Sequence, residues 1–431
     1  MKKHFTLLSF STFALLTSVT LFSADSPSAS TKRPILITVD DLPIAADSQH
    51  TDPAERLKIT QGMLKVLAKH HITAVALVAG KHHPKPADEK LLDLWLQGGH
   101  ELGNHSFSHP DYSLLEIKPY IDDIEKERQW LVAYLQAHGK SLRFFRFPFL
   151  NEGNTPEKLK AMRDYLKSTG QTNLPVTIDD QDWSFEEDWV KARRADDRAA
   201  LKIIAADYQA ALRIHVDHFE SLGERLFGRK APEIILLHAL EVSAAQWDEF
   251  FTWLETTGHR FASADEVLRD PAYQTPHEYV ARNGISLWDR IRVERRKAEV
   301  PAAVKKILDE QIAAWNSGDV EKFVSYYAED ATFVSPGGFS KGRKAVLDRY
   351  KLKYPDRKAM GTLSLDITET RLIAGEEFSM FGDTVPGHVQ GVTVAARWKL
   401  DYDGKPPAAG TTLLVFRPRG EGWEIVQDAS M

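Results

Sequence analysis

Carboxylates and imidazoles recur at the ends of apolar segments in the first half of the chain. Asp40 and Asp41 are adjacent after the apolar run at 35–39, and His105 and His109 are four residues apart. That spacing puts both imidazoles on one face if the segment makes a helical turn, and two imidazoles with one carboxylate form a common zinc site. One of the two acids could bind the metal while the other acts on water. The plainer alternatives are an acidic turn or helix cap and two exposed loop histidines.

Three later segments repeat the pattern of an apolar run that ends in polar residues. Arg146 ends one run, Asp182 and Trp183 close a second, and His238 ends the run at 233–238. An arginine beside a carboxylate can orient it and keep it ionised. Taken singly, these residues could equally be a surface arginine, a solvated acidic turn and a buried core histidine.

The elements that must position these residues alternate between strands and helices. Strands are expected at 35–39 and 73–78, and each is followed by a helical pattern. Further strands are expected at 143–147, 175–179, 233–238 and 260–263. This alternation predicts an α/β fold with parallel strands, either a barrel or an open sheet, with the site at the carboxyl ends of the strands. An insertion that reads largely as helix, at 196–227, precedes the run at 233–238.

The sequence changes character near residue 284. A basic connector that contains a tryptophan is followed by an amphipathic helix at 304–315, a short helix and then mainly strands. Helices followed by a run of strands predict an α+β domain. The expected organisation is a first domain at 32–283, a linker at 284–300 and a second domain at 301–431.

The composition is typical of a globular protein without sulfur chemistry. Of the 431 residues, 43% are hydrophobic and 27% are charged. The formal charge of −6 disfavours nucleic acid as a partner, because binding a polyanion needs a basic surplus. The chain has no cysteine, which excludes disulfides, thiolate zinc sites and cysteine nucleophiles.

The first 24 residues have the pattern of a secretory signal peptide. Lys2 and Lys3 precede an apolar stretch at 5–22, and small residues end at Ala24. A membrane anchor needs about 20 strongly apolar residues, whereas this stretch is shorter and contains many hydroxyls. We therefore expect signal residues 1–24, an exported protein in the periplasm or outside the cell, and no stable membrane span.

In this order along the chain, the segments resemble the polysaccharide deacetylases of carbohydrate esterase family 4, in particular nodulation-factor-deacetylase-like members. The resemblance covers about residues 34–271 and implies a distorted (β/α) barrel. The matching segments are Thr38-Val39-Asp40-Asp41-Leu42-Pro43, Asn104-His105-Ser106-Phe107-Ser108-His109, Arg146-Phe147-Pro148-Phe149, Asp179-Asp180-Gln181-Asp182-Trp183 and Leu236-Leu237-His238.

The resemblance also implies roles for ten residues. Two departures from the family pattern concern substrate contacts: Leu42 stands where a glycine is usual, which predicts a bulkier loop beside the site, and Phe149 stands where a tyrosine is usual. The implied roles are the metal ligands Asp41, His105 and His109; the general base Asp40 with its tether Arg146; the general acid His238 with its partner Asp182; and the substrate-binding residues Phe149, Trp183 and Leu236.

The implied reaction is metal-dependent hydrolysis of an acetyl group on a carbohydrate such as a chitooligosaccharide or a peptidoglycan fragment, with release of acetate. Zinc is the expected ion, although cobalt, nickel or iron also suits two histidines and one aspartate. The alternatives are an O-acetyl ester deacetylase that acts on xylan-like glycans and a carbohydrate-binding protein without catalysis.

The C-terminal region, from Ala314-Trp315-Asn316-Ser317-Gly318-Asp319 onward, resembles the nuclear transport factor 2-like (SnoaL-like) superfamily. That resemblance implies an α+β fold in which a curved sheet and helices form a cone-shaped pocket. Members of this superfamily differ widely in function, so the fold does not give the function. We expect a ligand-positioning or dimerisation module, with a homodimer formed through this domain.

Overall fold

The computed structural model describes residues 32–46, 48–82, 86–378, 384–420 and 422–431. The expected signal peptide, residues 1–24, lies outside this part of the chain. In the described residues, no helix combines the length and the apolar character that crossing a membrane requires.

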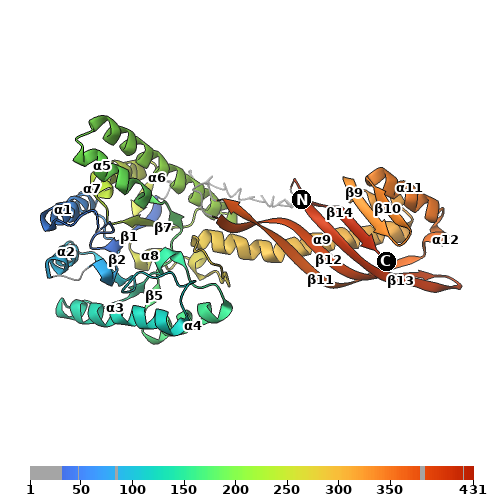
Figure 1. Cartoon of the computed structure of the whole chain (residues 1–431), viewed down its shortest axis with the longest axis horizontal. Coiled ribbons are helices and arrows are strands. Elements are labelled where there is room, and N and C mark those ends of the chain that lie inside the picture. Colours follow the sequence, from blue (N-terminus) through green and yellow to red (C-terminus); the bar gives the residue numbers. More distant parts are fainter. Residues whose placement is uncertain (1–31, 47, 83–85, 379–383, 421) are drawn as a thin grey trace, which may run out of the picture. The chain divides into compact units, whose positions relative to one another are not determined.

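The first sheet is parallel throughout and curls into a half-barrel, which confirms the expected α/β architecture (Figure 1). Its strand order is β5-β4-β3-β2-β1-β7-β6, and β8 pairs with β1. Central strand β1 has fully buried side chains at Leu36 and Val39, as expected for a strand that is covered on both faces. The strands are β1 (Arg33–Leu42), β2 (Val75–Val78), β3 (Glu101–Asn104), β4 (Phe144–Phe145), β5 (Thr172–Asn173), β6 (Ile178–Asp179), β7 (Glu233–His238) and β8 (His259–Phe261).

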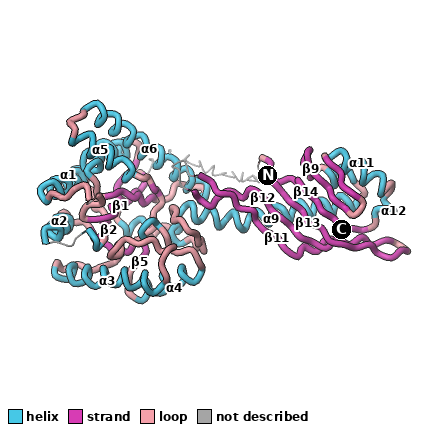
Figure 2. The backbone as a smooth tube through the Cα atoms, viewed as in Figure 1, coloured by secondary structure: helices cyan, strands magenta, loops and turns pink. Residues whose placement is uncertain are grey.

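Helices enclose this sheet (Figure 2). Local sequence sets where they begin: Asp52 caps α1 and Thr155 caps α4 through side-chain oxygens, and a proline follows each cap. The expected helical insertion at 196–227 is confirmed as α6. The α-helices are α1 (Pro53–Lys69), α2 (Pro86–Gln97), α3 (Ile117–Ala137), α4 (Pro156–Ser168), α5 (Glu186–Arg194), α6 (Arg198–Phe227), α7 (Glu241–Thr256) and α8 (Ala264–Val267), and the 3-10 turns are η1 (Gly80–His82), η2 (Pro148–Leu150), η3 (Asp182–Phe185) and η4 (Pro271–Gln274).

The C-terminal region forms a second sheet with its own apolar core, as expected for an α+β domain. The strand order is β10-β9-β14-β13-β12-β11, in which β9 and β14 are parallel and the other pairs are antiparallel. Trp315, Phe323 and Phe416 belong to the core that this sheet shares with its helices. The elements are α10 (Val320–Val324), β9 (Tyr327–Ser335), β10 (Gly338–Lys341), α11 (Arg343–Lys353), α12 (Arg357–Met360), β11 (Thr362–Phe378), β12 (Thr384–Tyr402), β13 (Lys405–Arg419) and β14 (Gly422–Ser430).

One helix, α9 (Leu287–Ser317), contributes to both cores. Its first turns bury Trp288 and Ile291 in the core of the half-barrel, and its later turns bury Leu308 in the second core. The expectation of a helix confined to 304–315 was therefore wrong in its start. Pro301 and the basic residues before it hide the helical pattern in the sequence, but the helix continues through this proline.

Candidate active site

The predicted site residues converge at the carboxyl ends of the parallel strands. Asp40 at the end of β1 is in register with His238 at the end of β7. On the other side, the Arg146 backbone N–H donates to the Asn104 carbonyl at 3.0 Å, which places the residue after β4 beside the end of β3. A cleft of about 980 Å³ opens here. Eight of the ten predicted residues line it, and Arg146 and Asp182 lie buried behind Asp40 and His238.

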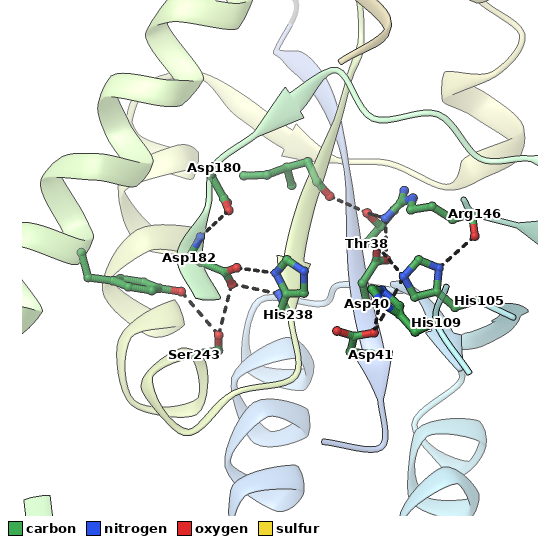
Figure 3. Close-up of polar contacts among 12 residues, drawn as sticks. Thr38, Asp40, Asp41, His105, His109, Arg146, Asp180, Asp182, His238 and Ser243 are labelled. Carbon is green, nitrogen blue, oxygen red and sulfur yellow. Dashed lines mark hydrogen bonds and ion pairs between the residues drawn. The ribbon is translucent and has the colours of Figure 1, made fainter. Parts of the chain in front are cut away.

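Three of these residues point ligand atoms at one another (Figure 3). Asp41 Oδ1 lies 3.4 Å from His109 Nε2 and 3.8 Å from His105 Nε2. This buried carboxylate oxygen has no hydrogen-bond partner among the described residues, although an orphaned buried acceptor is costly. The donor set and the orphaned oxygen fit a divalent cation between the three side chains.

The protonation states of these groups suit metal binding. His105 Nδ1 lies 2.9 Å from the carbonyl oxygen of Arg146, which can only accept, so Nδ1 is the donor in this bond and Nε2 is the nitrogen that faces Asp41. Burial lowers the pKa of His109 to about 3, which leaves its imidazole neutral. Burial alone would raise the pKa of Asp41, but the positive charges that His109 and His105 carry when protonated outweigh it and lower the pKa, so the carboxylate is ionised at neutral pH.

The segment from His105 to His109 does not form the helical turn that would explain its spacing. Ser106 and His109 have left-handed φ values of 66° and 55°, and they turn the chain back toward Asp41. Asp123 on α3 holds this turn by accepting from the backbone N–H groups of Phe107 and Ser108, both at 3.0 Å. The two imidazoles therefore meet through a capped loop.

Asp40 is held from behind by Arg146. The guanidinium Nη1 donates to Asp40 Oδ1 at 2.7 Å and to the Thr38 hydroxyl at 2.8 Å, and Nε donates to the Leu174 carbonyl at 3.1 Å. All of these groups are buried. The other oxygen of Asp40, Oδ2, lies 3.5 Å from His105 Nε2 and so faces the metal ligands. Thr38 is a further site residue that the sequence did not single out.

His238 is paired with Asp182 across the cleft from this group (Figure 3). Its Nδ1 lies 2.6 Å from Asp182 Oδ1, and its backbone N–H donates to Asp182 Oδ2 at 2.9 Å. Burial works against a charged imidazole, but Asp182 outweighs it, aided by Asp41 and Asp40, and the pKa of His238 rises to about 10. The imidazole is therefore a cation at neutral pH.

Three buried residues behind this pair were missed from the sequence. Asp180 accepts from the backbone N–H of Asp182 at 3.1 Å. The Ser243 hydroxyl donates to Asp182 at 3.4 Å, and Tyr208 of the helical insertion lies 3.5 Å from Ser243. The repeated acids at 179–182 hinted at Asp180, whereas Ser243 and Tyr208 come from helices distant in the sequence.

The walls of the cleft offer apolar and aromatic surface. The indole of Trp183 is 55% exposed, and the ring of Phe149 is 60% exposed and lies 4.7 Å from the His109 ring. Leu236 packs with Leu150 and Val176 in a small apolar cluster. The bulkier loop expected from Leu42 is wrong, because this side chain is fully buried in the core.

The connector that precedes α9 supplies a wall of the cleft that the sequence did not predict. Arg282, Asn283, Gly284, Ile285 and Ser286 all line the cleft. Residues 282 and 283 end the expected first domain and residues 284–286 begin the expected linker, and no motif in this segment predicts a place at the site.

His50, Glu55 and Glu241 form a second group of potential ligands. The negative charges of its two glutamates are compensated by an arginine. Arg193 Nε binds Glu241 at 2.7 Å, and the same guanidinium pairs with Glu55. His50 Nε2 lies 2.8 Å from Glu186. This cluster therefore links helices α1, α5 and α7 behind the cleft.

Comparison with known proteins finds two families in the chain. The polysaccharide deacetylase family model matches residues 28–173, and the SnoaL-like domain model matches residues 308–425. A curated relative, an uncharacterized 30.6 kDa protein of Geobacillus stearothermophilus, is 25% identical over 225 residues, which are 51% of this chain and 69% of that protein.

Similar solved structures fall into the same two groups. A family 4 carbohydrate esterase from Streptomyces lividans in complex with acetate is 17% identical and covers 54% of this chain and 92% of its own, with a TM-score of 0.36. A family 4 pseudoenzyme from Bacillus anthracis is 16% identical and covers 56% of this chain and 66% of its own, with a TM-score of 0.38. An NTF-2 like protein of unknown function from Shewanella oneidensis is 26% identical and covers 30% of this chain and 97% of its own, with a TM-score of 0.26.

Proposed function

Because the N-terminal part of this chain is a polysaccharide deacetylase domain and its C-terminal part is a SnoaL-like domain, we propose that the protein is a metal-dependent deacetylase of acetylated carbohydrates. The observation that carries this proposal is the arrangement in one cleft of three metal-ligand side chains, a tethered carboxylate and a charged histidine. Metal-assisted hydrolysis of an acetyl amide uses these functions together.

Asp41, His105 and His109 would hold the ion. A bound divalent cation polarises the acetyl carbonyl and lowers the pKa of water, so that hydroxide is available near neutral pH. Zinc suits two imidazoles and one carboxylate best, and cobalt, nickel and iron accept the same ligands.

Asp40 is the proposed general base. Its Oδ2 faces the metal ligands, while Oδ1 is fixed by Arg146 at 2.7 Å. One oxygen is therefore free to take a proton from water, while the buried guanidinium holds the other in place. Arg146 itself lies behind Asp40 and is a positioning residue.

His238 is the proposed general acid. An amine leaves a tetrahedral intermediate poorly unless it is protonated, so the acid must carry a proton at the working pH. The pairing with Asp182 raises the pKa of His238 to about 10 and keeps the imidazole protonated at neutral pH. The backbone amide of Phe149 is the proposed donor to the oxyanion.

The proposed substrate is a carbohydrate with an N-acetyl group, such as a chitooligosaccharide or a peptidoglycan fragment. Trp183 and Phe149 expose aromatic faces at the cleft on which sugar rings can stack. Leu236, with Leu150 and Val176, offers an apolar wall for the acetyl methyl group. A strongly protonated acid favours an amide, whose leaving group needs a proton, over the alternative of an O-acetyl ester on a xylan-like glycan.

A protein that binds carbohydrate without turnover is the competing proposal, since similar structures include a pseudoenzyme. The complete set of metal-ligand and acid–base side chains favours catalysis, because a binding site has no need for a buried arginine–carboxylate tether behind its ligands.

We also propose that the protein is exported and forms a homodimer through its C-terminal domain. Export is supported by the sequence pattern of residues 1–24. The dimer is supported by an apolar stripe of Phe339, Val334, Ala429 and Leu413, which are neighbours across strands β10, β9, β14 and β13. Phe339 is 76% exposed, and such a stripe is typical of a surface that is covered by a partner.

The function is tested by measuring acetate release from chitooligosaccharides, peptidoglycan fragments and acetylxylan. We expect zinc-dependent release that a chelator abolishes and that is strongest with an N-acetylated substrate. His109→Ala should abolish release. Purified protein that binds no divalent ion and releases no acetate from any of the three substrates would overturn the proposal.

A further inference from the structure

The connector before α9, here residues 282–286, packs directly against the turn at 148–151. A Cβ on Gly284 would lie 2.1 Å from the Phe149 carbonyl oxygen and 2.3 Å from the Leu150 carbonyl carbon, so only glycine fits there. Asn151 Nδ2 donates to the Arg282 carbonyl at 2.5 Å. The backbone of the connector and the backbone of the turn are therefore in contact.

Arg290, in the first turns of α9, ties the two segments together. Its Nη2 donates to the Leu150 carbonyl at 2.5 Å, and its Nε donates to the Ile285 carbonyl at 2.9 Å. Its Nη1 forms a buried ion pair with Glu152, which also accepts from Asn173 at 2.8 Å. The whole guanidinium is thus engaged, and its charge is compensated.

The turn needs such support because its backbone is strained. Phe149 and Leu150 have φ values of 55° and 52°, a left-handed conformation that disfavours residues with side chains. Two successive residues of this kind persist only where the surrounding structure holds them. Arg290 donates to the carbonyl of Leu150, and the backbone of Gly284 packs against the carbonyls of Phe149 and Leu150, so both support the turn.

The same turn borders the reacting groups. The Phe149 ring contacts the His109 ring, and the Leu150 side chain packs with Leu236 beside the cleft. A shift of this turn would move the proposed oxyanion donor and the apolar wall together. The metal ligands belong to other loops, and His105 is fixed by the carbonyl of Arg146, which precedes the turn.

We propose that Arg290 is a positioning residue for deacetylation. The segment that leads to the C-terminal domain, the connector and the first turns of α9, therefore contributes to the deacetylase site. The inference rests on the proposed function. It predicts that substitutions of Arg290 or of Gly284 reduce turnover without reducing metal binding.

The test compares full-length variants with an N-acetylated chitooligosaccharide and with 4-nitrophenyl acetate. Arg290→Lys keeps the charge beside Glu152 but cannot make all three contacts, and Gly284→Ala displaces the Phe149 carbonyl from the other side. We expect kcat to fall about 10- to 100-fold for both substrates, with KM within about threefold and with one metal ion still bound. The two substrates should lose activity equally, because an oxyanion forms in both reactions.

His238→Gln provides a contrasting pattern. The nitrophenolate leaves without a proton, so loss of the general acid should impair the amide much more than the aryl ester. Arg295→Ala is the matched control, since this arginine lies on the same helix but donates to Leu226 at the end of α6. It should leave both activities unchanged.

The outcomes separate the inference from the proposed function. If the wild-type protein is active and both Arg290→Lys and Gly284→Ala retain kcat within about twofold, the inference is wrong. The same conclusion follows if they lose activity only in proportion to lost metal or lost folded protein. If the wild-type protein hydrolyses neither substrate, the proposed function fails first.

Discussion

Arg146 binds two residues of the site, Asp40 through its side chain and His105 through its main-chain carbonyl. Its side chain donates to Asp40 at 2.7 Å, and its main-chain carbonyl accepts from His105 Nδ1 at 2.9 Å. The side chain therefore orients the proposed base, while the carbonyl fixes the tautomer of a proposed metal ligand. Substitution of the side chain can remove the first function and leave the second.

Arg146→Met should separate catalysis from metal binding. We expect kcat for acetate release to fall about 100-fold or more, because Asp40 loses the hydrogen bond that orients it toward the metal ligands. The protein should be destabilised by about 3–5 kcal/mol, since a buried carboxylate loses its partner. Zinc stoichiometry, measured on the purified protein, should stay at the wild-type value. Loss of zinc in parallel with activity would contradict this division of roles, and Asp40→Asn provides the control that removes the base directly.

Removal of the metal should destabilise the protein. Without an ion, the buried Asp41 Oδ1 has no hydrogen-bond partner among the described residues, and binding to the folded state alone adds about 4 kcal/mol at a thousandfold excess over Kd. Melting temperatures with zinc and with chelator should therefore differ clearly for the wild type. Asp41→Asn and His109→Ala should show no such difference, and a zinc response in either variant would place the ion elsewhere.

The sequence predicted which residue types form the site, but it did not predict how the backbone brings them together. The order of acids, histidines and an arginine at the ends of apolar runs indicated the polar candidates, because the ends of parallel strands meet at one edge, and the family resemblance assigned their roles and added the substrate-binding residues Phe149, Trp183 and Leu236. The spacing of His105 and His109 suggested a helical turn, whereas the structure uses a left-handed loop held by Asp123. That difference arises from a contact with the next helix, α3, which the spacing of the two histidines does not reveal.

The parts that escaped prediction depend on tertiary contacts. Thr38 and Ser243 are unremarkable in the sequence, and they acquire a role only because Arg146 and Asp182 are brought beside them. The connector was read as a linker because nothing in its composition shows that Gly284 fits against Phe149. Sequence patterns identify groups that can react, but the groups that support them are defined by packing.

Asp182→Asn should alter the pH dependence of stability in the metal-free protein. The folded pKa of His238 is raised from 6.5 to about 10, so its contribution to stability is complete below about pH 6.5 and is lost as the pH rises toward 10. The wild type should therefore lose stability across this range, measured by urea unfolding at several pH values. Both Asp182→Asn and His238→Gln should show a much flatter profile. An unchanged slope in both variants would show that another group titrates.

A charge on the apolar stripe of the second sheet should dissociate the proposed dimer. Leu413 is 46% exposed and lies beside Ala429 on the outer face, so Leu413→Glu would place charges in the interface. Light scattering coupled to gel filtration should give a dimer for the wild type and a monomer for the variant. Leu352→Glu is the matched control, because this leucine is 86% exposed on α11, outside the stripe. A monomeric wild type would refute the proposed dimer.

Trp183→Ala should weaken substrate binding more than turnover. The indole is 55% exposed at the cleft, whereas the neighbouring Asp182 is buried and pairs with His238. Loss of a stacking surface should raise KM for a chitooligosaccharide about 10-fold, which corresponds to about 1.4 kcal/mol, and leave kcat within about threefold. Trp183→Phe should stay close to the wild type because it keeps an aromatic face. If instead Trp183→Ala lowers kcat and leaves KM unchanged, the indole acts by positioning the Asp182 turn, and the sugar binds elsewhere in the cleft.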